Sequence, residues 1–108
     1  MTPIQLATLI GNVLTQLDSK LSDPAFPMSD PNWQTLYALR KHLDDLQRSL
    51  VQASIEEGDP LYTGLTQQIT AANTDLQTVI NDITKVNAMI NDLSQIASAV
   101  DQILKLKP

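Results

Sequence analysis

An apolar repeat that runs through most of the second half of the chain constrains the fold more than any other feature. From Leu65 to Leu104 the apolar residues alternate at spacings of three and four, and no proline or glycine interrupts them. Such a repeat places an apolar stripe along a helix that packs against a neighbouring helix. The sequence therefore predicts one long helix over residues 60–106, which at 1.5 Å per residue would be about 69 Å long.

Three places in the sequence carry the same signal for the start of a helix, a side-chain acceptor followed by proline. The acceptor can cap free backbone N–H groups, and proline fits the first turn, where its missing N–H costs nothing. The three pairs are Thr2-Pro3, Asp30-Pro31 and Asp59-Pro60. Two more prolines within residues 22–29 indicate a connector there. We therefore expect three helices, over residues 3–21, 31–57 and 60–106.

The leucines of the second expected helix follow the same heptad phase as the repeat of the third, from Leu36 to Leu50. Two helices in matching phase, joined by the short Gly58-Asp59-Pro60 turn, are typical of an antiparallel helical hairpin. The predicted fold is therefore all-α: a single domain over residues 1–108, with an elongated, coiled-coil-like hairpin and an additional N-terminal helix. The sequence leaves open whether that N-terminal helix lies end to end with the second helix or beside it.

Composition bounds the chemistry that the chain can perform. It has no cysteine and one histidine, His42, which we expect at the edge of the helix seam, beside Asp75. A general base needs an orienting partner, and zinc needs more ligands than these. We therefore expect no catalytic, cofactor-binding or metal-binding residues, and a protein that is not an enzyme. No small-molecule substrate is expected either.

Charge and hydropathy bound the partners and the location. The net charge of −5 argues against nucleic acid, which requires a basic surface. No apolar stretch approaches the roughly 20 residues of a membrane span. The first lysine is Lys20, so the basic region of a secretory signal is missing. We expect a cytoplasmic protein, or one exported without a cleaved signal.

The expected partner is another protein or a second copy of the chain. The residue before each a position of the heptad is polar in the first half of the last helix and apolar in the second half, so the second half presents a face wide enough for two neighbours. The N-terminal helix could be the second neighbour, or part of the face could stay open for a partner. The predicted partner-binding residues are Met89, Ile96, Val100 and Ile103.

Few charged residues stand on the polar side of the helices. Residues 61–108 contain seven, and Thr, Asn, Gln and Ser fill most other polar positions. Such a surface loses its water at lower cost, so it tolerates burial in an assembly, although a compositional habit of the source would give the same pattern. Residues 2–17 carry no charge at all. The alternative function is therefore a membrane-active protein that uses its uncharged N-terminal helix, although such helices usually carry Lys or Arg.

Overall fold

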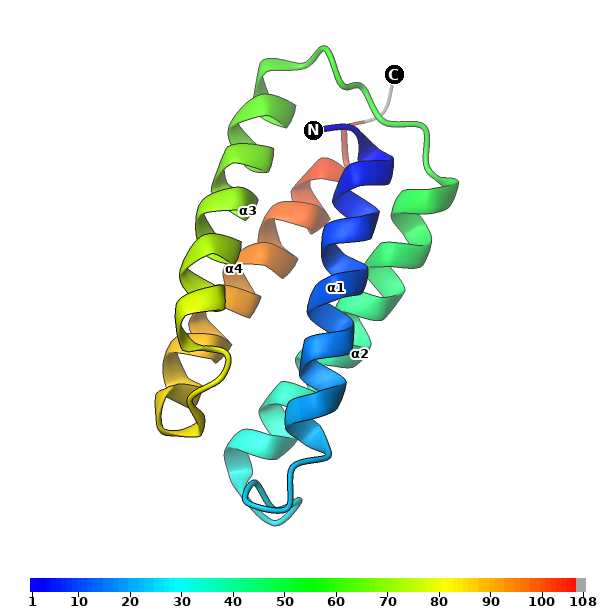
Figure 1. The fold of residues 1–108 in the computed structure, drawn as a ribbon. Helices are drawn as coiled ribbons and strands as arrows, with labels where there is room; N and C mark the ends of the chain where they lie inside the picture. Colours follow the sequence, from blue (N-terminus) through cyan, green and yellow to red (C-terminus); the bar gives the residue numbers. More distant parts are fainter. Residues whose placement is uncertain (107–108) are drawn as a thin grey trace.

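The computed structural model describes residues 1–106, which contain four α-helices and no β-strand (Figure 1). The helices are α1 (Pro3–Leu21), α2 (Pro31–Gln52), α3 (Pro60–Val79) and α4 (Val86–Ile103), with a single 3-10 turn, η1 (Ile83–Lys85), before α4. The prediction that the chain is all-helical is confirmed. The prediction of three helices is wrong, because the expected helix over residues 60–106 is divided into α3 and α4.

α1, α2 and α3 begin where the three pairs of a side-chain acceptor and a proline predict them to begin. Thr2 accepts a hydrogen bond from the backbone N–H of Gln5, and the Gln5 side chain accepts one from the Thr2 N–H, which completes a capping box. Asp30 caps α2 and Asp59 caps α3, each accepting from the backbone N–H two residues further on at 2.9 Å. These three helices begin at the proline of each pair because the cap and the ring favour the same turn.

A fourth cap, without proline, divides the long apolar repeat. The Asp82 carboxylate accepts hydrogen bonds from the backbone N–H of Thr84 at 3.0 Å and from its hydroxyl at 2.6 Å. These two bonds, together with the positive charge of Lys85, lower the pKa of Asp82. An aspartate that bonds the backbone just ahead of it competes with helix continuation, so the chain turns between Val79 and η1. The apolar spacing continues across this turn, so the spacing alone does not indicate that the helix is divided.

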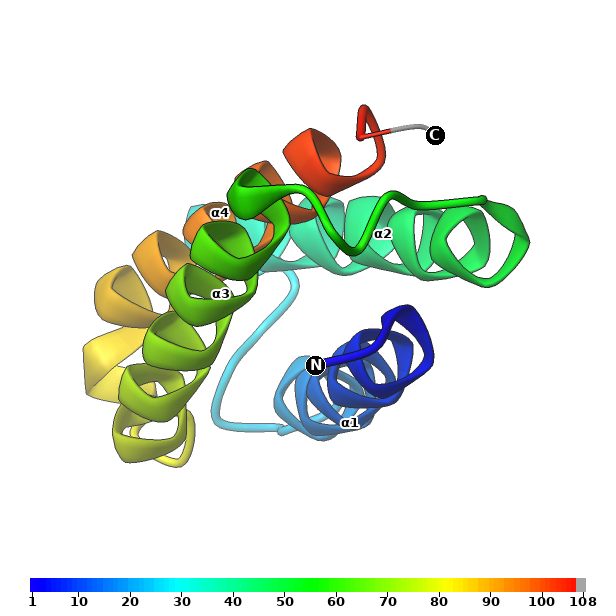
Figure 2. The same cartoon turned by 90° about the horizontal axis from the view of Figure 1, so that it is seen from above.

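The helices pack around the bundle in the order α1, α2, α4, α3 (Figure 2). α1 lies beside α2, α2 beside α4 and α4 beside α3, whereas α1 and α3 face each other across the fourth side. Figure 1 shows that α1 and α3 run in one direction and α2 and α4 in the other. α2 packs on α4 and not on α3, and the molecule measures only 45 × 23 × 19 Å, so the predicted elongated hairpin is wrong. The open question about α1 is also decided, since α1 folds back beside α2.

The segment between α2 and α3 explains why these two helices do not form the predicted hairpin. α2 ends at Gln52, and Ala53 is already extended, so residues 53–59 form a crossing segment in place of a tight turn. A segment of this length spans up to about 23 Å, enough to cross the end of the bundle. Ile55 packs partly buried against the core, and the N–H of Glu56 donates to the carbonyl of Leu106 at 2.8 Å. These tertiary contacts hold the segment across the bundle and carry α3 away from α2.

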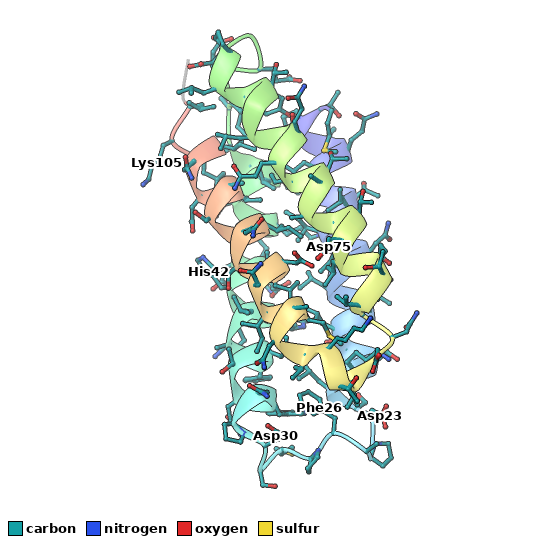
Figure 3. The ribbon with its side chains drawn as sticks, turned by 90° about the vertical axis from the view of Figure 1, so that its left-hand side faces the viewer. Asp23, Phe26, Asp30, His42, Asp75 and Lys105 are labelled. Atoms are coloured by element: carbon teal, nitrogen blue, oxygen red, sulfur yellow. The ribbon has the colours of Figure 1, made fainter. Side chains whose placement is uncertain are left out.

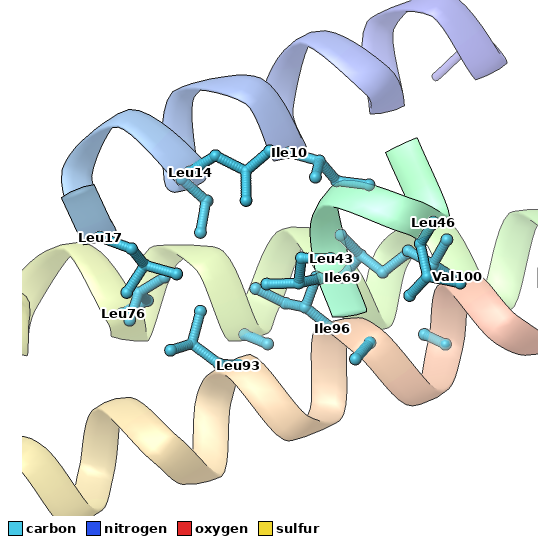
Figure 4. Close-up of a cluster of buried hydrophobic side chains, with 14 of the residues drawn as sticks. Ile10, Leu14, Leu17, Leu43, Leu46, Ile69, Leu76, Leu93, Ile96 and Val100 are labelled. Carbon is cyan, nitrogen blue, oxygen red and sulfur yellow. The ribbon is translucent and has the colours of Figure 1, made fainter. Parts of the chain in front are cut away.

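The core draws on all four helices (Figure 4). Ile10 and Leu17 of α1, Leu43 of α2, Leu76 of α3 and Leu93 of α4 are among its fully buried side chains. Nearly all of it is aliphatic, since only 4% of the residues in the sequence are aromatic. Each helix contributes one apolar stripe, which leaves its opposite side to solvent.

Candidate interaction surface

The predicted partner-binding residues lie inside the core and not on a surface. Met89, Ile96, Val100 and Ile103 of α4 are at most 1% exposed. α4 packs on α3 and on α2 together, so two neighbours from the same chain cover its wide apolar face. A partner could reach these four side chains only if the helices of the bundle separated.

The single histidine has a different neighbour from the predicted one. His42 Nε2 lies 3.1 Å from Oδ2 of Asp101 on α4, and both side chains are about half exposed. Asp75 lies on α3 (Figure 3) and contacts Asp92 instead. The predicted pairing of His42 with Asp75 is wrong because α2 has α4, and not α3, as its neighbour.

An aromatic pair seals the connector between α1 and α2. The rings of Trp33 and Tyr37 stack with centroids 5.3 Å apart, and the Trp33 indole N–H donates to the carbonyl of Leu21 at 2.9 Å. Phe26, within the connector, is buried. Tyr37 is about half exposed and Lys41 lies above its ring. The buried rings hold the chain reversal in place, so this cluster has a structural role.

A groove of about 700 Å³ lies between α1 and α3, on the side of the bundle where these helices do not pack together. Amide and hydroxyl side chains form most of its walls, and Leu9 and the buried Val13 are its apolar members. The lining residues are Gln5, Thr8, Leu9, Asn12, Val13, Thr15, Gln16, Asn73 and Gln77.

Hydrogen bonds fasten α1 to α3 at two places along this side. Near the start of both helices, the Tyr62 hydroxyl donates to the Met1 carbonyl at 2.6 Å. Further along, the amides of Gln16 and Gln77 bond reciprocally, at 2.7 and 2.9 Å. The two helices are thus held at a fixed separation by polar contacts and not by an apolar seam, which leaves the groove open between them.

The helices that flank the groove are free of charged side chains over most of their length. Residues 3–17 of α1 and residues 60–74 of α3 contain no Asp, Glu, Lys, Arg or His. Both stretches begin at the same end of the bundle, so they form one neutral face (Figure 1). α2 differs sharply, since Arg40, Asp44 and Arg48 form a row of ion pairs along it and Arg40 also binds Asp18 at the end of α1. The neutral face follows from the fold, which puts two uncharged segments side by side.

A buried carboxyl on α4, that of Asp92, contacts the carboxyl of Asp75, which is exposed on α3. Asp92 is only 4% exposed, and its Oδ2 atom has no hydrogen-bond partner within residues 1–106. Burial raises the pKa of Asp92 to about 6, and the hydrogen bond to the Asp75 carboxyl and its negative charge contribute to this rise. Neither residue lines the groove. The pair therefore bears on the stability of the α3–α4 contact and not on the groove.

Within residues 1–106, no three His, Asp or Glu side chains gather closely enough to hold a metal ion. No helix there combines the length and the apolar character needed to cross a bilayer.

Comparisons with known proteins give no likeness to this chain. No protein family model, no curated protein and no solved structure matches it. Its function must therefore be argued from the site itself.

The sequence shows that residues 2–17 carry no charge and that residues 61–108 carry few charges. It does not show that α1 and α3 lie next to each other. That requires the break at residues 80–85, because only a divided helix lets α4 return through the bundle and leave α3 at the edge facing α1.

Proposed function

We propose that this protein is a non-enzymatic interaction subunit that docks on a protein partner through the groove and neutral face of α1 and α3. The single observation that carries the proposal is that the open side of the bundle is also its uncharged side. The chain's own helices cover the apolar face of α4. The proposed binding surface is therefore the groove between α1 and α3, and not α4.

The cost of removing water favours this face over the others. Burying a charged group without a partner costs several kcal/mol, whereas a neutral amide or hydroxyl costs less once it is hydrogen-bonded. The centres of protein interfaces are accordingly depleted of charged residues. On α2 a partner would have to cover the ion pairs of Arg40 and Arg48. On the α1–α3 face it meets no charged side chain between residues 3 and 17 or between residues 60 and 74.

The threonines of this face are already prepared for burial. Thr8 and Thr15 donate their hydroxyl protons to the carbonyls of Ile4 and Gly11 in the preceding turn, at 3.0 and 3.1 Å. Thr70 does the same towards Thr66 on α3, at 2.9 Å. Covering these side chains therefore leaves no hydroxyl donor unpaired, which removes the main penalty of burying such a group.

Site-specific photo-crosslinking in living cells tests the proposal. A photoreactive phenylalanine analogue at Thr8 lies in the groove, and the same analogue at the exposed Asp45 of α2 is the matched control. We expect irradiation to give a covalent adduct with protein from position 8 and none, or far less, from position 45. Equal adducts from both positions, or no adduct from position 8, would contradict a docking role for this face.

A further inference from the structure

We infer that the occupant of the α1–α3 groove is a second copy of this chain, so that the protein forms a two-fold symmetric dimer through its neutral face. The inference rests on the proposed function and names its partner. Three features of the face support it: its charge, its bonding capacity and its geometry.

Repulsion between carboxylates disfavours contact between two copies on the charged parts of the surface, but not on the neutral face. Each chain carries a net charge of −5, so two copies repel each other wherever their carboxylates approach. Most acidic groups lie on other parts of the chain, including Asp44 and Asp45 on α2 and Glu56, Glu57 and Asp59 in the crossing segment. Of those on α1 and α3, Asp18 is paired with Arg40 and Asp75 contacts Asp92 of α4. Contact through α1 and α3 keeps these groups away from the interface, and an exposed pair more than about 8 Å apart is largely screened at physiological salt.

The side chains of the face are their own complements. Each Asn or Gln amide offers both donors and an acceptor, so two such groups can bond reciprocally. Gln16 and Gln77 already form such a pair across the groove within one chain. Gln5, Asn12 and Asn73 line the same groove. Their amides can make the same contact with a second copy, and a face of this kind pairs with itself without any opposite charge.

Geometry permits a small symmetric dimer. α1 and α3 run in the same direction (Figure 1). A two-fold axis that lies in the plane of the face and is perpendicular to the helices therefore sets α1 and α3 antiparallel to those of the other copy, which is favourable for their dipoles. The uncharged stretches of 15 residues are about 22 Å long and the molecule is 23 Å wide, giving roughly 500 Å² per copy. The total of roughly 1,000 Å² is at the lower limit for a biological interface. Ile4, one turn before Thr8 on α1, is 77% exposed and provides an apolar anchor.

The test measures the mass of the purified full chain across a range of concentrations by sedimentation equilibrium. We expect the mass to rise from 11.9 kDa towards 23.8 kDa, twice the chain mass, as concentration increases. Asn12 stands midway along α1 and lines the groove, so a two-fold axis that crosses the helices at the middle of the face passes close to it. Asn12→Glu and Asn12→Lys should each raise the dissociation constant at least tenfold, and an equimolar mixture of the two variants should dimerise again. Asp45→Lys on α2 is the control and should not weaken the dimer.

Several outcomes would overturn the inference. A wild-type chain that stays at 11.9 kDa up to millimolar concentration does not pair with itself. A dimer that the Asn12 variants leave intact uses another surface. Both results are compatible with the proposed function if the adduct from position 8 in cells joins this chain to a different protein. The absence of both dimer and adduct refutes the inference and the proposed function together, while circular dichroism checks that each variant is folded.

Discussion

Replacing Asp92 by asparagine should stabilise the protein at neutral pH. The Asp92 carboxyl is 4% exposed, has one oxygen without a hydrogen-bond partner among residues 1–106 and faces the carboxyl of Asp75 across the α3–α4 contact. Asparagine has nearly the same shape, carries no charge at any pH, and its amide N–H can donate to Asp75. The substitution therefore removes the cost of a buried negative charge without opening a cavity.

The pKa of Asp92 sets the size and the pH dependence of the effect. Burial and Asp75 raise this pKa from 3.8 to about 6, a difference of about two units, and each unit corresponds to about 1.4 kcal/mol. Because the folded-state pKa is the higher one, the folded protein holds the proton more tightly than the unfolded chain. The contribution of this group to stability is therefore intact below about pH 4, is lost as the pH rises to about 6, and amounts to a penalty of about 3 kcal/mol above that.

Urea unfolding between pH 4 and pH 8 measures this effect, with the fluorescence of the only tryptophan, the buried Trp33, as reporter. We expect Asp92→Asn to raise the free energy of unfolding by about 2–3 kcal/mol at pH 7.5 and by almost nothing at pH 4. The exposed Asp45→Asn is the matched control and should show no such pH-dependent gain. A variant less stable than the wild type at pH 7.5, or a difference that does not change with pH, would refute the reasoning.

Two further predictions test the packing. Gly64→Ala should raise the free energy of unfolding by about 0.5–1 kcal/mol, because the new methyl group meets no other part of the described chain within 4 Å and alanine favours the helix. Gly11→Ala should give no such gain in the same denaturant assay, since its methyl group would come within 2.9 Å of the Gln47 amide, which donates to the Ala7 carbonyl. An equal gain in the free energy of unfolding at both positions would show that α1 and α2 do not approach so closely. Ile96→Lys should abolish the folded helical signal in circular dichroism, because it buries an unpaired charge at a position that is 0% exposed. A folded Ile96→Lys variant would mean that this side chain lies on a surface.

The break between α3 and α4 shows where interpretation of the sequence failed. The spacing from Leu65 to Leu104 is compatible with one helix because the apolar residues of α3 and those of α4 follow the same repeat. The decisive feature was Asp82, which caps the 3-10 turn η1 that leads into α4, without the proline that marked the other three helix starts. Asp and Thr side chains can bond the local backbone in turns, but they also occur within helices. Only the packing of Val79 and Val86 into one core makes the turn the better solution.

The candidate surface could be predicted in its composition but not in its position. The absence of charge in residues 3–17 and 60–74 is plain in the sequence. The choice of Met89, Ile96 and Ile103 as a binding surface followed from a helix too long for its neighbours to cover. Because α2 and α3 both pack on α4, those side chains lie in the core. The neutral face of α1 and α3 remains on the surface.

The sequence by itself determined the helical class and three of the helix starts. Caps such as Thr2 and Asp59 act within one turn, and an aliphatic stripe requires a helical neighbour wherever it occurs. The tertiary structure decided which helices became neighbours. A leucine stripe packs on any other stripe of suitable spacing, so α2 could satisfy its apolar face on α3 or on α4. The crossing segment, held by the bond from Glu56 to Leu106, made α4 that neighbour and left α3 facing α1 across an open groove.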